Sequence, residues 1–232
     1  MPDPASVNSM FGRIAHRYDL ANRVLSAGID IHWRTRLVGA VAKSGAREVL
    51  DLATGSGDVA FALARGLPAG ARVVGMDFCA PMLEVAEAKR KGRAGAAALV
   101  EFRAGDGLAI PAPACSFDAV TIAFGLRNMA DRPACLAEIR RVLRPGGGLF
   151  ILEFSQPWPW VRPFYSFYLR RLVPRVAGLL TGDPDAYKYL GDTIGAFPGR
   201  DALSAEILAG GFSQVGALAM TAGIVALHAA RR

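Results

Sequence analysis

Short apolar runs alternate with stretches of helical periodicity along most of the chain. Strands are expected at 48–52, 72–76, 100–103, 119–123 and 149–154, with helices at 58–65, 81–90 and 133–143. A helix over 201–209 and two strands at 215–220 and 224–229 follow. Apolar strands that alternate with helices are typical of a mainly parallel sheet covered on both faces. The pattern therefore predicts an α/β, Rossmann-like fold with seven strands and helices on both faces.

Two segments stand outside this alternation. At the N-terminus, helices are predicted over 9–25 and 30–41, the first with apolar residues at helical spacing on one face. The second segment, 156–200, interrupts the alternation between the fifth strand and the helix at 201–209. We expect a single domain over 1–232, in which 1–45 forms a helical cap and 156–200 a helical, aromatic insertion.

Composition agrees with one globular domain, because 52% of the 232 residues are hydrophobic and 20% are charged. No apolar run reaches the ~18 residues that a membrane-spanning helix needs, and no secretory signal is evident. We therefore expect a cytoplasmic protein with reduced thiols at its three widely spaced cysteines. With three histidines in all, a metal site is not expected. The cysteines are Cys79, Cys115 and Cys135.

A glycine-rich loop follows the strand at 48–52. Gly55 and Gly57 permit positive φ and a close approach of backbone to a ligand, and Ser56 lies between them. Asp51 ends the strand, and Asp77, which ends the next one, is placed to accept hydrogen bonds from a ribose diol. The alternative is that the two glycines only make a tight turn and bind no ligand. A glycine pair alone is weak evidence for a ligand site.

A dinucleotide is the second alternative, since 55–60 satisfies the loose G-x-G-x-x-A pattern. Asp58 argues against it, because a carboxylate at the start of the helix repels a pyrophosphate. The ligand weighed against the dinucleotide is S-adenosylmethionine, which carries no phosphate, so an acidic loop is compatible with it. Residues 141–149 add a helix end, a Pro-Gly-Gly turn and a strand, the arrangement of the fifth strand in methyltransferases. Methyl transfer from S-adenosylmethionine is the favoured interpretation.

Asp106 and Gly107 follow the third strand, where they are placed to contact the adenine of such a cofactor. A helix cap or turn is the alternative role of Asp106.

Several motifs resemble the ubiquinone/menaquinone biosynthesis C-methyltransferases, the demethylmenaquinone methyltransferase and 2-methoxy-6-polyprenyl-1,4-benzoquinol methylase type. They are found at 10–19, 33–34, 51–58, 121–128, 141–147, 152–157, 189–190, 197–198 and 223–228. The resemblance implies a Rossmann-like class I methyltransferase fold. It also implies cofactor contacts at Ser56, Asp77, Asp106 and Gly107, and near Ala123 after the fourth strand. Ala123 stands where some members have serine, so a contact there is through backbone. Serine at 56, where many members have threonine, keeps the hydroxyl.

The same resemblance implies carbon methylation of a polyprenylated quinol ring without a metal. Ring carbon becomes nucleophilic when a hydroxyl loses its proton, and a phenol has a pKa of about 10. Arg127 is expected to stabilise the phenolate and Asn128 to position a ring oxygen. The ring-facing candidates are His16, Tyr18 and Asp19. The alternative for Arg127 and Asn128 is a turn at the start of a helix, paired with Asp131.

The net charge of +7 is unevenly spread. No acidic residue lies between Glu153 and Asp183, whereas four arginines and many aromatic residues do. We expect 156–200 to form a substrate lid, and its aromatic, basic part to contact the membrane surface at the inner face. Ordinary helix packing is the alternative. Nucleic acid is not expected as a partner, because no RNA-binding module is evident.

Several questions stay open at this point. The substrate is demethylmenaquinol, the methoxy-benzoquinol ring or both, and homo-oligomerisation is undecided. The alternatives to a quinol methyltransferase are a methyltransferase for RNA or another small molecule, and an inactive cofactor-binding protein of the same fold.

Overall fold

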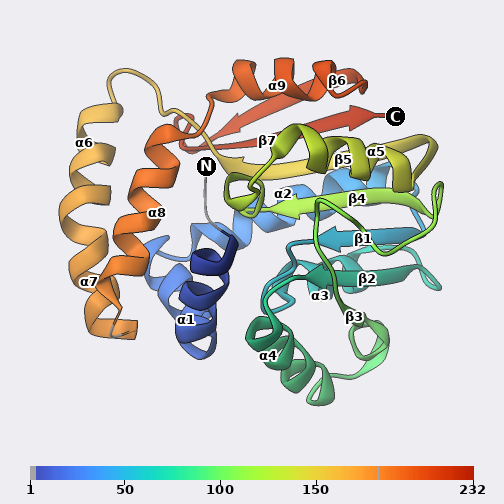
Figure 1. Cartoon of the computed structure of the whole chain (residues 1–232), viewed down its shortest axis with the longest axis horizontal. Helices are drawn as coiled ribbons and strands as arrows, with labels where there is room; N and C mark the ends of the chain where they lie inside the picture. Colours follow the sequence, from blue (N-terminus) through green and yellow to red (C-terminus); the bar gives the residue numbers. More distant parts are fainter. Residues whose placement is uncertain (1–3, 182) are drawn as a thin grey trace.

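The computed structural model describes residues 4–181 and 183–232. Its centre is a seven-stranded sheet in the order β3-β2-β1-β4-β5-β7-β6 (Figure 1). The four pairs among β1 to β5 are parallel, whereas β7 runs antiparallel to both β5 and β6. The strands are β1 (Glu48–Leu52), β2 (Arg72–Asp77), β3 (Glu101–Ala104), β4 (Phe117–Ala123), β5 (Leu143–Phe154), β6 (Ser213–Met220) and β7 (Val225–Arg231).

Alternate residues of the central strands enter two separate cores, which is why both faces of the sheet are covered. Leu50 and Leu52 pack with α5 (Arg132–Val142) and α9 (Arg200–Ala209) on one face. On the other face, Val49 packs with α2 (Ile29–Lys43) and α3 (Asp58–Gly66). This arrangement confirms the prediction of an α/β fold with a mainly parallel seven-stranded sheet.

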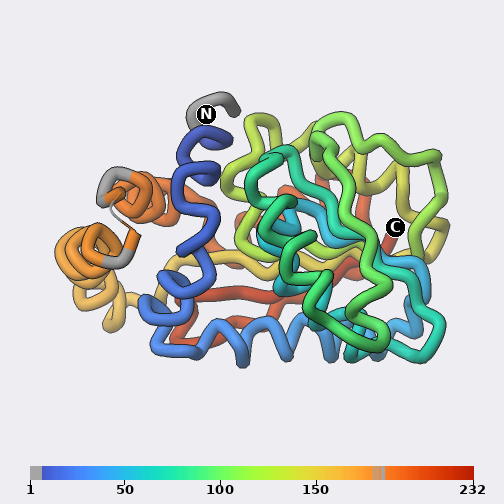
Figure 2. The backbone as a smooth tube through the Cα atoms, turned by 90° about the horizontal axis from the view of Figure 1, so that it is seen from below, coloured from blue at the N-terminus to red at the C-terminus, as the bar shows by residue number. Residues whose placement is uncertain are grey.

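The remaining helices extend the molecule beyond the sheet. They are α1 (Pro4–Leu25), α4 (Ala80–Lys91), α6 (Arg162–Phe167), α7 (Val173–Thr181) and α8 (Pro184–Ala196), with short turns η1 (Gly95–Leu99) and η2 (Leu126–Asn128) and a π-helical turn η3 (Tyr168–Leu172). Figure 2 shows α1 between the α6–α8 segment and α4. A third apolar core joins α1, η3, α7 and α8. The N-terminal helices and the insertion therefore pack together beside the sheet.

The structure departs from the sequence-based expectations in local detail. The first helix begins at Pro4 rather than at residue 9. The expected turn at 144–147 is an irregularity within β5, because Leu143 already pairs with Phe117 and regular pairing resumes at Gly148. The antiparallel β7 was not foreseen, since apolar periodicity carries no strand direction. All three cysteines are free thiols.

Two structural features are absent from residues 4–181 and 183–232. No helix there has the length and apolar character to cross a membrane. No group of three or more histidine, cysteine, aspartate or glutamate side chains in that part of the chain is arranged to ligate a metal.

Candidate active site

The carboxyl ends of β1 and β4 form a cleft in which the backbone takes up unusual conformations. Gly55 and Gly57 have φ values of 56° and 83°, as the loop sequence predicts. Ala53 and Phe124, although they carry side chains, also lie at positive φ, of 54° and 57°. Such strain concentrates at ligand sites, where the surrounding fold compensates for it. A Cβ on Gly125 would lie 2.5 Å from that of Ala53, so only glycine allows these two loops to meet.

Asp77 organises one wall of this cleft. Its carboxylate oxygens accept hydrogen bonds from the backbone N–H of Gly55 at 2.7 Å and of Cys79 at 2.9 Å. Burial raises the pKa of Asp77, although these backbone donors favour the ionised form and oppose the shift. The carboxylate is thereby fixed at the end of β2, and each oxygen retains a lone pair for a ligand hydroxyl.

Asp51 lies deeper in the same cleft. Its carboxylate accepts hydrogen bonds from the hydroxyls of Thr54 at 2.6 Å and Thr121 at 2.7 Å. Burial raises the pKa of Asp51 to about 6, and the two hydroxyls limit that rise. At neutral pH the cleft therefore holds a buried negative charge that a cationic ligand would stabilise.

A chain of ion pairs connects the glycine loop with helices α1 to α4. The Ser56 hydroxyl donates to Asp19 of α1 at 2.5 Å, and the Lys89 ammonium contacts both Asp19 and Asp58. Arg34 of α2 also donates to Asp58, at 2.7 Å. Burial opposes ionisation of Asp58, but Lys89 and Arg34 outweigh it and lower the pKa of that carboxyl. Asp19 thus ties α1 to the loop.

The charges of the cleft suit S-adenosylmethionine better than a phosphate ligand. The cleft has a volume of about 80 Å³. Its charged lining residues are Asp19, Asp51, Asp58, Asp77 and Arg34. Four carboxylates favour a sulfonium and an ammonium and repel a pyrophosphate. Arg34 is the one basic lining residue among those described, and its guanidinium is paired with Asp58 at 2.7 Å.

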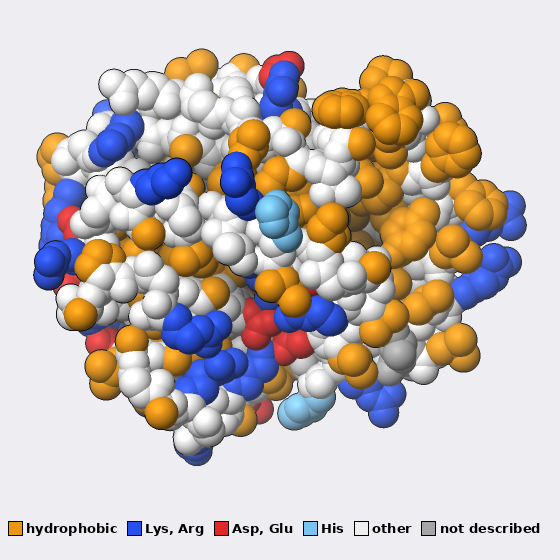
Figure 3. All heavy atoms as spheres, turned by 180° about the vertical axis from the view of Figure 1, so that it is seen from behind, with side chains coloured by type: hydrophobic (Ala, Val, Ile, Leu, Met, Phe, Trp, Pro, Cys, Tyr) orange, Lys and Arg blue, Asp and Glu red, His pale blue; other side chains and the backbone are white. Residues whose placement is uncertain are grey.

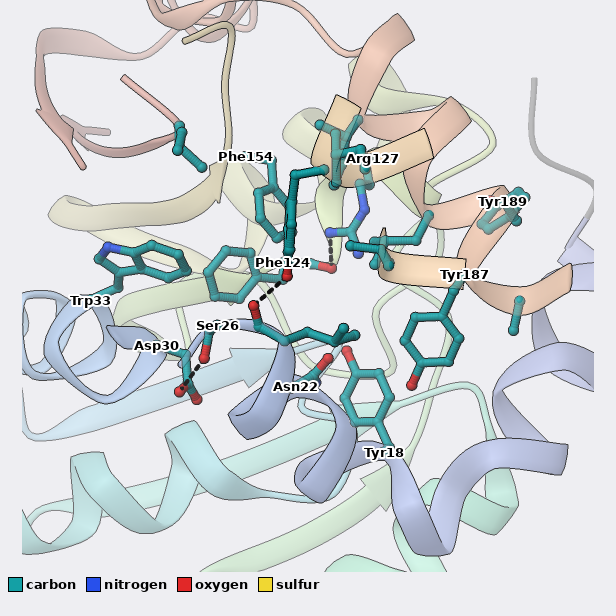
Figure 4. Close-up of a pocket in the computed structure, with 18 of the residues that line it drawn as sticks. Tyr18, Asn22, Ser26, Asp30, Trp33, Phe124, Arg127, Phe154, Tyr187 and Tyr189 are labelled. Carbon is teal, nitrogen blue, oxygen red and sulfur yellow. Dashed lines mark hydrogen bonds between the residues drawn. The ribbon is translucent and has the colours of Figure 1, made fainter. Parts of the chain in front are cut away.

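A second cavity, of about 280 Å³, adjoins the cleft (Figure 4). It lies among α1, α2, η3, α7 and α8, and it shares four lining residues with the cleft: Phe11, Tyr18, Arg34 and Phe124. All five tyrosines of the chain line it, together with Trp33, Phe124, Phe154 and aliphatic side chains. The tyrosines are Tyr18, Tyr165, Tyr168, Tyr187 and Tyr189. The cavity is shaped for an aromatic, largely apolar molecule.

Arg127 supplies the cavity with a buried cation. Its guanidinium pairs with Glu153 at 2.8 Å, bonds the Phe124 carbonyl oxygen, and lies 5.2 Å from the ring centroid of Phe154. The side chains of Arg127 and Glu153 are only 4% and 1% exposed. The suggested pairing with Asp131 is wrong, because that carboxylate caps α5 by accepting from the Ala134 N–H.

The structure brings together some of the predicted site residues and separates others. Asp51, Gly55, Ser56, Asp77 and Ala123 line the cleft, as do Asp19 and Asn128, while Arg127 lines the cavity and Tyr18 lines both. Gly57, Asp106 and Gly107 line neither, and His16 is exposed on α1 away from both. Asp106 accepts from the Leu108 N–H in a turn. His228 is a buried residue of β7 whose Nε2 donates to the Arg200 carbonyl oxygen.

Sequence reasoning missed two partners of the site. Glu153, which fixes Arg127, is a carboxylate inside an otherwise apolar strand, and that anomaly was the available signal. Lys89, which joins Asp19 to Asp58, is one of several basic residues at the end of α4, and nothing in the sequence distinguishes it from the others.

Solved structures of other proteins share this fold. The chain superimposes on an S-adenosylmethionine-dependent methyltransferase from Aquifex aeolicus with a TM-score of 0.57, at 18% identity over 80% of this chain and 81% of that one. A methyltransferase of the same kind from Thermotoga maritima gives 0.67, at 16% identity, over 96% and 98%. The fold is that of S-adenosylmethionine-dependent methyltransferases.

Sequence comparison narrows the class. Residues 2–232 match the model of the ubiE/COQ5 methyltransferase family, and the chain belongs to this family. It is 46% identical to a demethylmenaquinone methyltransferase of Thermus thermophilus, over 96% of this chain and 100% of that one. It is 43% identical to a ubiquinone/menaquinone biosynthesis C-methyltransferase of Syntrophotalea carbinolica, over 96% and 92%. The protein is accordingly an S-adenosylmethionine-dependent C-methyltransferase.

Proposed function

We propose that the protein methylates a ring carbon of demethylmenaquinol. The observation that carries this proposal is the adjacency of an acidic cleft and an aromatic cavity that share Phe11, Tyr18, Arg34 and Phe124. A methyl donor in the first and a quinol ring in the second would meet at this shared wall. The Thermus thermophilus relative named above, a demethylmenaquinone methyltransferase, supports the choice of substrate.

Bound S-adenosylmethionine supplies an electrophilic methyl group. The protein's residues hold the quinol and favour loss of the proton of a ring hydroxyl, which makes the ring carbon nucleophilic. Burial raises the pKa of Tyr165 and of Tyr189, so these phenols stay neutral and can donate hydrogen bonds to ring oxygens. A guanidinium is a poor general base, so the proton acceptor is sought elsewhere than at Arg127. We assign it the stabilisation of the developing phenolate, with Asn128 positioning a ring oxygen.

Glu153 has a separate part in this assignment. An arginine buried without a counter-ion would be costly, and Glu153, which is not among the cavity's lining residues, neutralises it. Tyr189 donates to the Asn128 side-chain oxygen at 3.4 Å, which links α8 to the same corner. Of the three expected ring-facing residues, Tyr18 lines both the cleft and the cavity, and we assign it that position. Asp19 is paired with Ser56 and Lys89, and His16 lines neither pocket. Water is an alternative proton acceptor.

We further assign the N-terminal segment 1–45 as a cap over the active site and the segment 156–200 as a lid over the quinol. Tyr165, Tyr168, Tyr187 and Tyr189 reach the cavity from this segment, and the Tyr168 hydroxyl bonds the Leu25 carbonyl oxygen at the end of α1. The outer side of the lid carries an exposed patch, seen at the right of Figure 3. Its exposed side chains are Trp158, Trp160, Arg162, Phe164, Phe167, Arg170, Arg171, Leu172, Arg175 and Leu179. Aromatic rings with arginines and no acid suit an anionic membrane surface.

Methyl transfer from radiolabelled S-adenosylmethionine tests the function. Demethylmenaquinol and the methoxy-benzoquinol are supplied in parallel, and the products are identified by mass. We expect methylation of demethylmenaquinol, with the new methyl on carbon. An Asp77→Ala variant should lose activity at limiting cofactor and thereby serve as the control. If folded protein that binds S-adenosylmethionine yields no methylated demethylmenaquinol, the proposal is contradicted.

A further inference from the structure

A third pocket, separate from the cleft and open to solvent, is lined by arginine side chains on the face of the sheet covered by α2 and α3. Its volume is about 430 Å³, and it is separate from the aromatic cavity. Its charged lining residues are Arg23 of α1, Arg34 of α2, Asp58 and Arg65 of α3, and Arg93 after α4. Four guanidinium groups therefore surround a single carboxylate. Figure 3, which views the molecule from behind, shows basic side chains gathered near a small acidic group.

The pocket's positive charge is only partly compensated. Asp58 accepts from Arg34 at 2.7 Å and lies 4.0 Å from Arg23, and both arginines also approach Asp30. Within residues 4–181 and 183–232, Arg65 and Arg93 have no acidic partner within ion-pair distance. The uncompensated charge is thus concentrated at the end of the pocket formed by these two residues.

Parts of the pocket are rigid before any ligand arrives. The Arg93 guanidinium stacks 4.1 Å above the ring of Phe61, which is fully buried. Gly66 allows α3 to approach α2 closely, because a Cβ at this position would lie 2.4 Å from Val38 Cγ1. A planar guanidinium held in place pays little entropy when it binds an oxyanion, and its paired N–H groups match the geometry of phosphate.

Apolar side chains adjoin the pocket. Ile31 lines it and is 54% exposed, while Leu20 and Val24 of α1 are 57% and 45% exposed. Leu20, Arg23 and Val24 have the i, i+3, i+4 spacing that places them on one helix face. Arginines beside exposed aliphatic residues match a phosphate that is attached to an apolar molecule.

We propose that this pocket binds a phosphate group, carried by an anionic phospholipid or by a soluble phosphate ester. The uncompensated end of the pocket lies outside the methyl-transfer site, since Arg65 and Arg93 line neither the cleft nor the aromatic cavity. Arg34 lines all three, so a bound phosphate would lie one side chain away from the cofactor cleft.

Two probes distinguish the two sources. Calorimetry with sodium pyrophosphate measures binding of a soluble phosphate, and sedimentation with phosphatidylglycerol–phosphatidylcholine vesicles measures binding of a head group. Arg65→Glu removes an exposed arginine from the pocket, and Arg93→Gln tests the stacked one. Arg140→Glu is the matched control, because it makes the same change of charge at an exposed position of α5, across the sheet from the pocket.

We expect Arg65→Glu and Arg93→Gln to weaken binding to at least one probe tenfold or more, with Arg140→Glu within twofold of the native protein. An effect on pyrophosphate assigns a soluble phosphate ester, and an effect on vesicles alone assigns the lipid head group. The proposal is overturned if Arg65→Glu and Arg140→Glu bind both probes equally. Methyl transfer by Arg65→Glu should equal that of the native enzyme, which keeps this test separate from the proposed function.

Discussion

The cofactor cleft and the aromatic cavity lie side by side but are built in different ways. The cleft is formed mainly by backbone turns and carboxylates at the ends of β1, β2 and β4, which the sheet fixes relative to one another. The cavity is formed by side chains of α1, α2, η3, α7 and α8, from residue 10 to residue 224. One site depends on the sheet, the other on helices packed beside it.

The two sites differ because their two ligands need different surroundings. A cofactor of constant structure can be bound by charges at fixed positions, and Asp51 and Asp77 are held by hydrogen bonds to the fold itself. A quinol with a long tail needs a wall of rings that closes around it. Substitutions in the cleft should therefore change cofactor affinity, and substitutions in the cavity should change turnover or quinol binding.

The largest expected effect is on the cavity side, from loss of Arg127. Replacement by alanine should lower turnover by about 10²–10³, the usual result of removing a group that stabilises developing charge. Cofactor affinity should change little, because Arg127 does not line the cleft. Steady-state kinetics with demethylmenaquinol, together with calorimetry of cofactor binding, measures both.

Removal of Arg127 alone leaves Glu153 as an unpaired buried charge, which typically costs 3–5 kcal/mol of stability. The double variant Arg127→Gln/Glu153→Gln avoids this cost, since both positions become neutral amides. If the folded double variant keeps near-native turnover, Arg127 has a structural role and the catalytic assignment is incorrect.

On the cleft side, Asp51→Asn should stabilise the unliganded protein at pH 7.5. The rise in the pKa of Asp51 from 3.8 to about 6 corresponds to roughly 3 kcal/mol, an upper limit for the gain. The sign follows from the raised value: protonated Asp51 stabilises the fold below about pH 4, and this stability is lost as pH rises through 6.

Urea unfolding at several pH values checks this expectation. The asparagine variant should be more stable than the native protein above pH 6, and the difference should shrink toward pH 4. Its affinity for S-adenosylmethionine should fall at the same time, because the cationic ligand loses its buried counter-charge. A variant that is less stable than the native protein at pH 7.5 would contradict the assigned environment of Asp51.

A further change in the cleft, Asp77→Ala, should weaken S-adenosylmethionine binding at least tenfold. Loss of a charge-assisted hydrogen bond costs roughly 1.5–3 kcal/mol, and the Gly55 N–H also loses its acceptor. Asp201→Ala, at an exposed position on α9, is the matched control. Unchanged affinity in a folded Asp77→Ala protein would remove this residue from the cofactor site.

The smallest effect concerns the outer side of the lid. Serine at Trp158, Trp160 and Phe164 should weaken binding to anionic vesicles severalfold, while the arginines, worth about 1 kcal/mol each, retain part of it. Serine at Leu99, Leu208 and Leu218 is the control, since these residues have similar exposure on other elements. Equal binding of the two triple variants at low and high salt would leave helix packing as the role of the patch.

The sheet and the glycine loop could be predicted from the sequence because their signals are local. Apolar alternation marks each strand, and the run from Asp51 to Asp58 contains its own turn chemistry. The cavity could not be predicted in the same way, because its lining residues are far apart in sequence and depend on how α1 packs against α7 and α8. Periodicity identifies the buried face of a helix and not the residues that it meets.

The charged contacts show the same limit. Asp19 was expected to face the substrate ring, and the structure instead directs its carboxylate to Ser56 and Lys89. The contacts expected of Asp106 and Gly107 with adenine, and the role of His16, stay predictions. For Arg127 the sequence suggested Asp131, four residues away, whereas Glu153 of the adjacent strand β5 is its partner.

The gathering of every tyrosine in one cavity makes the protein convenient for spectroscopy. A uniform 3-fluorotyrosine label would introduce five fluorine nuclei, and all of them would lie around the aromatic cavity. Fluorine spectra would then report ring entry, tail length and lid motion without background from the rest of the molecule. Trp33 lies in the same chamber, whereas Trp158 and Trp160 are on the outer patch, so indole emission would follow the two surfaces separately.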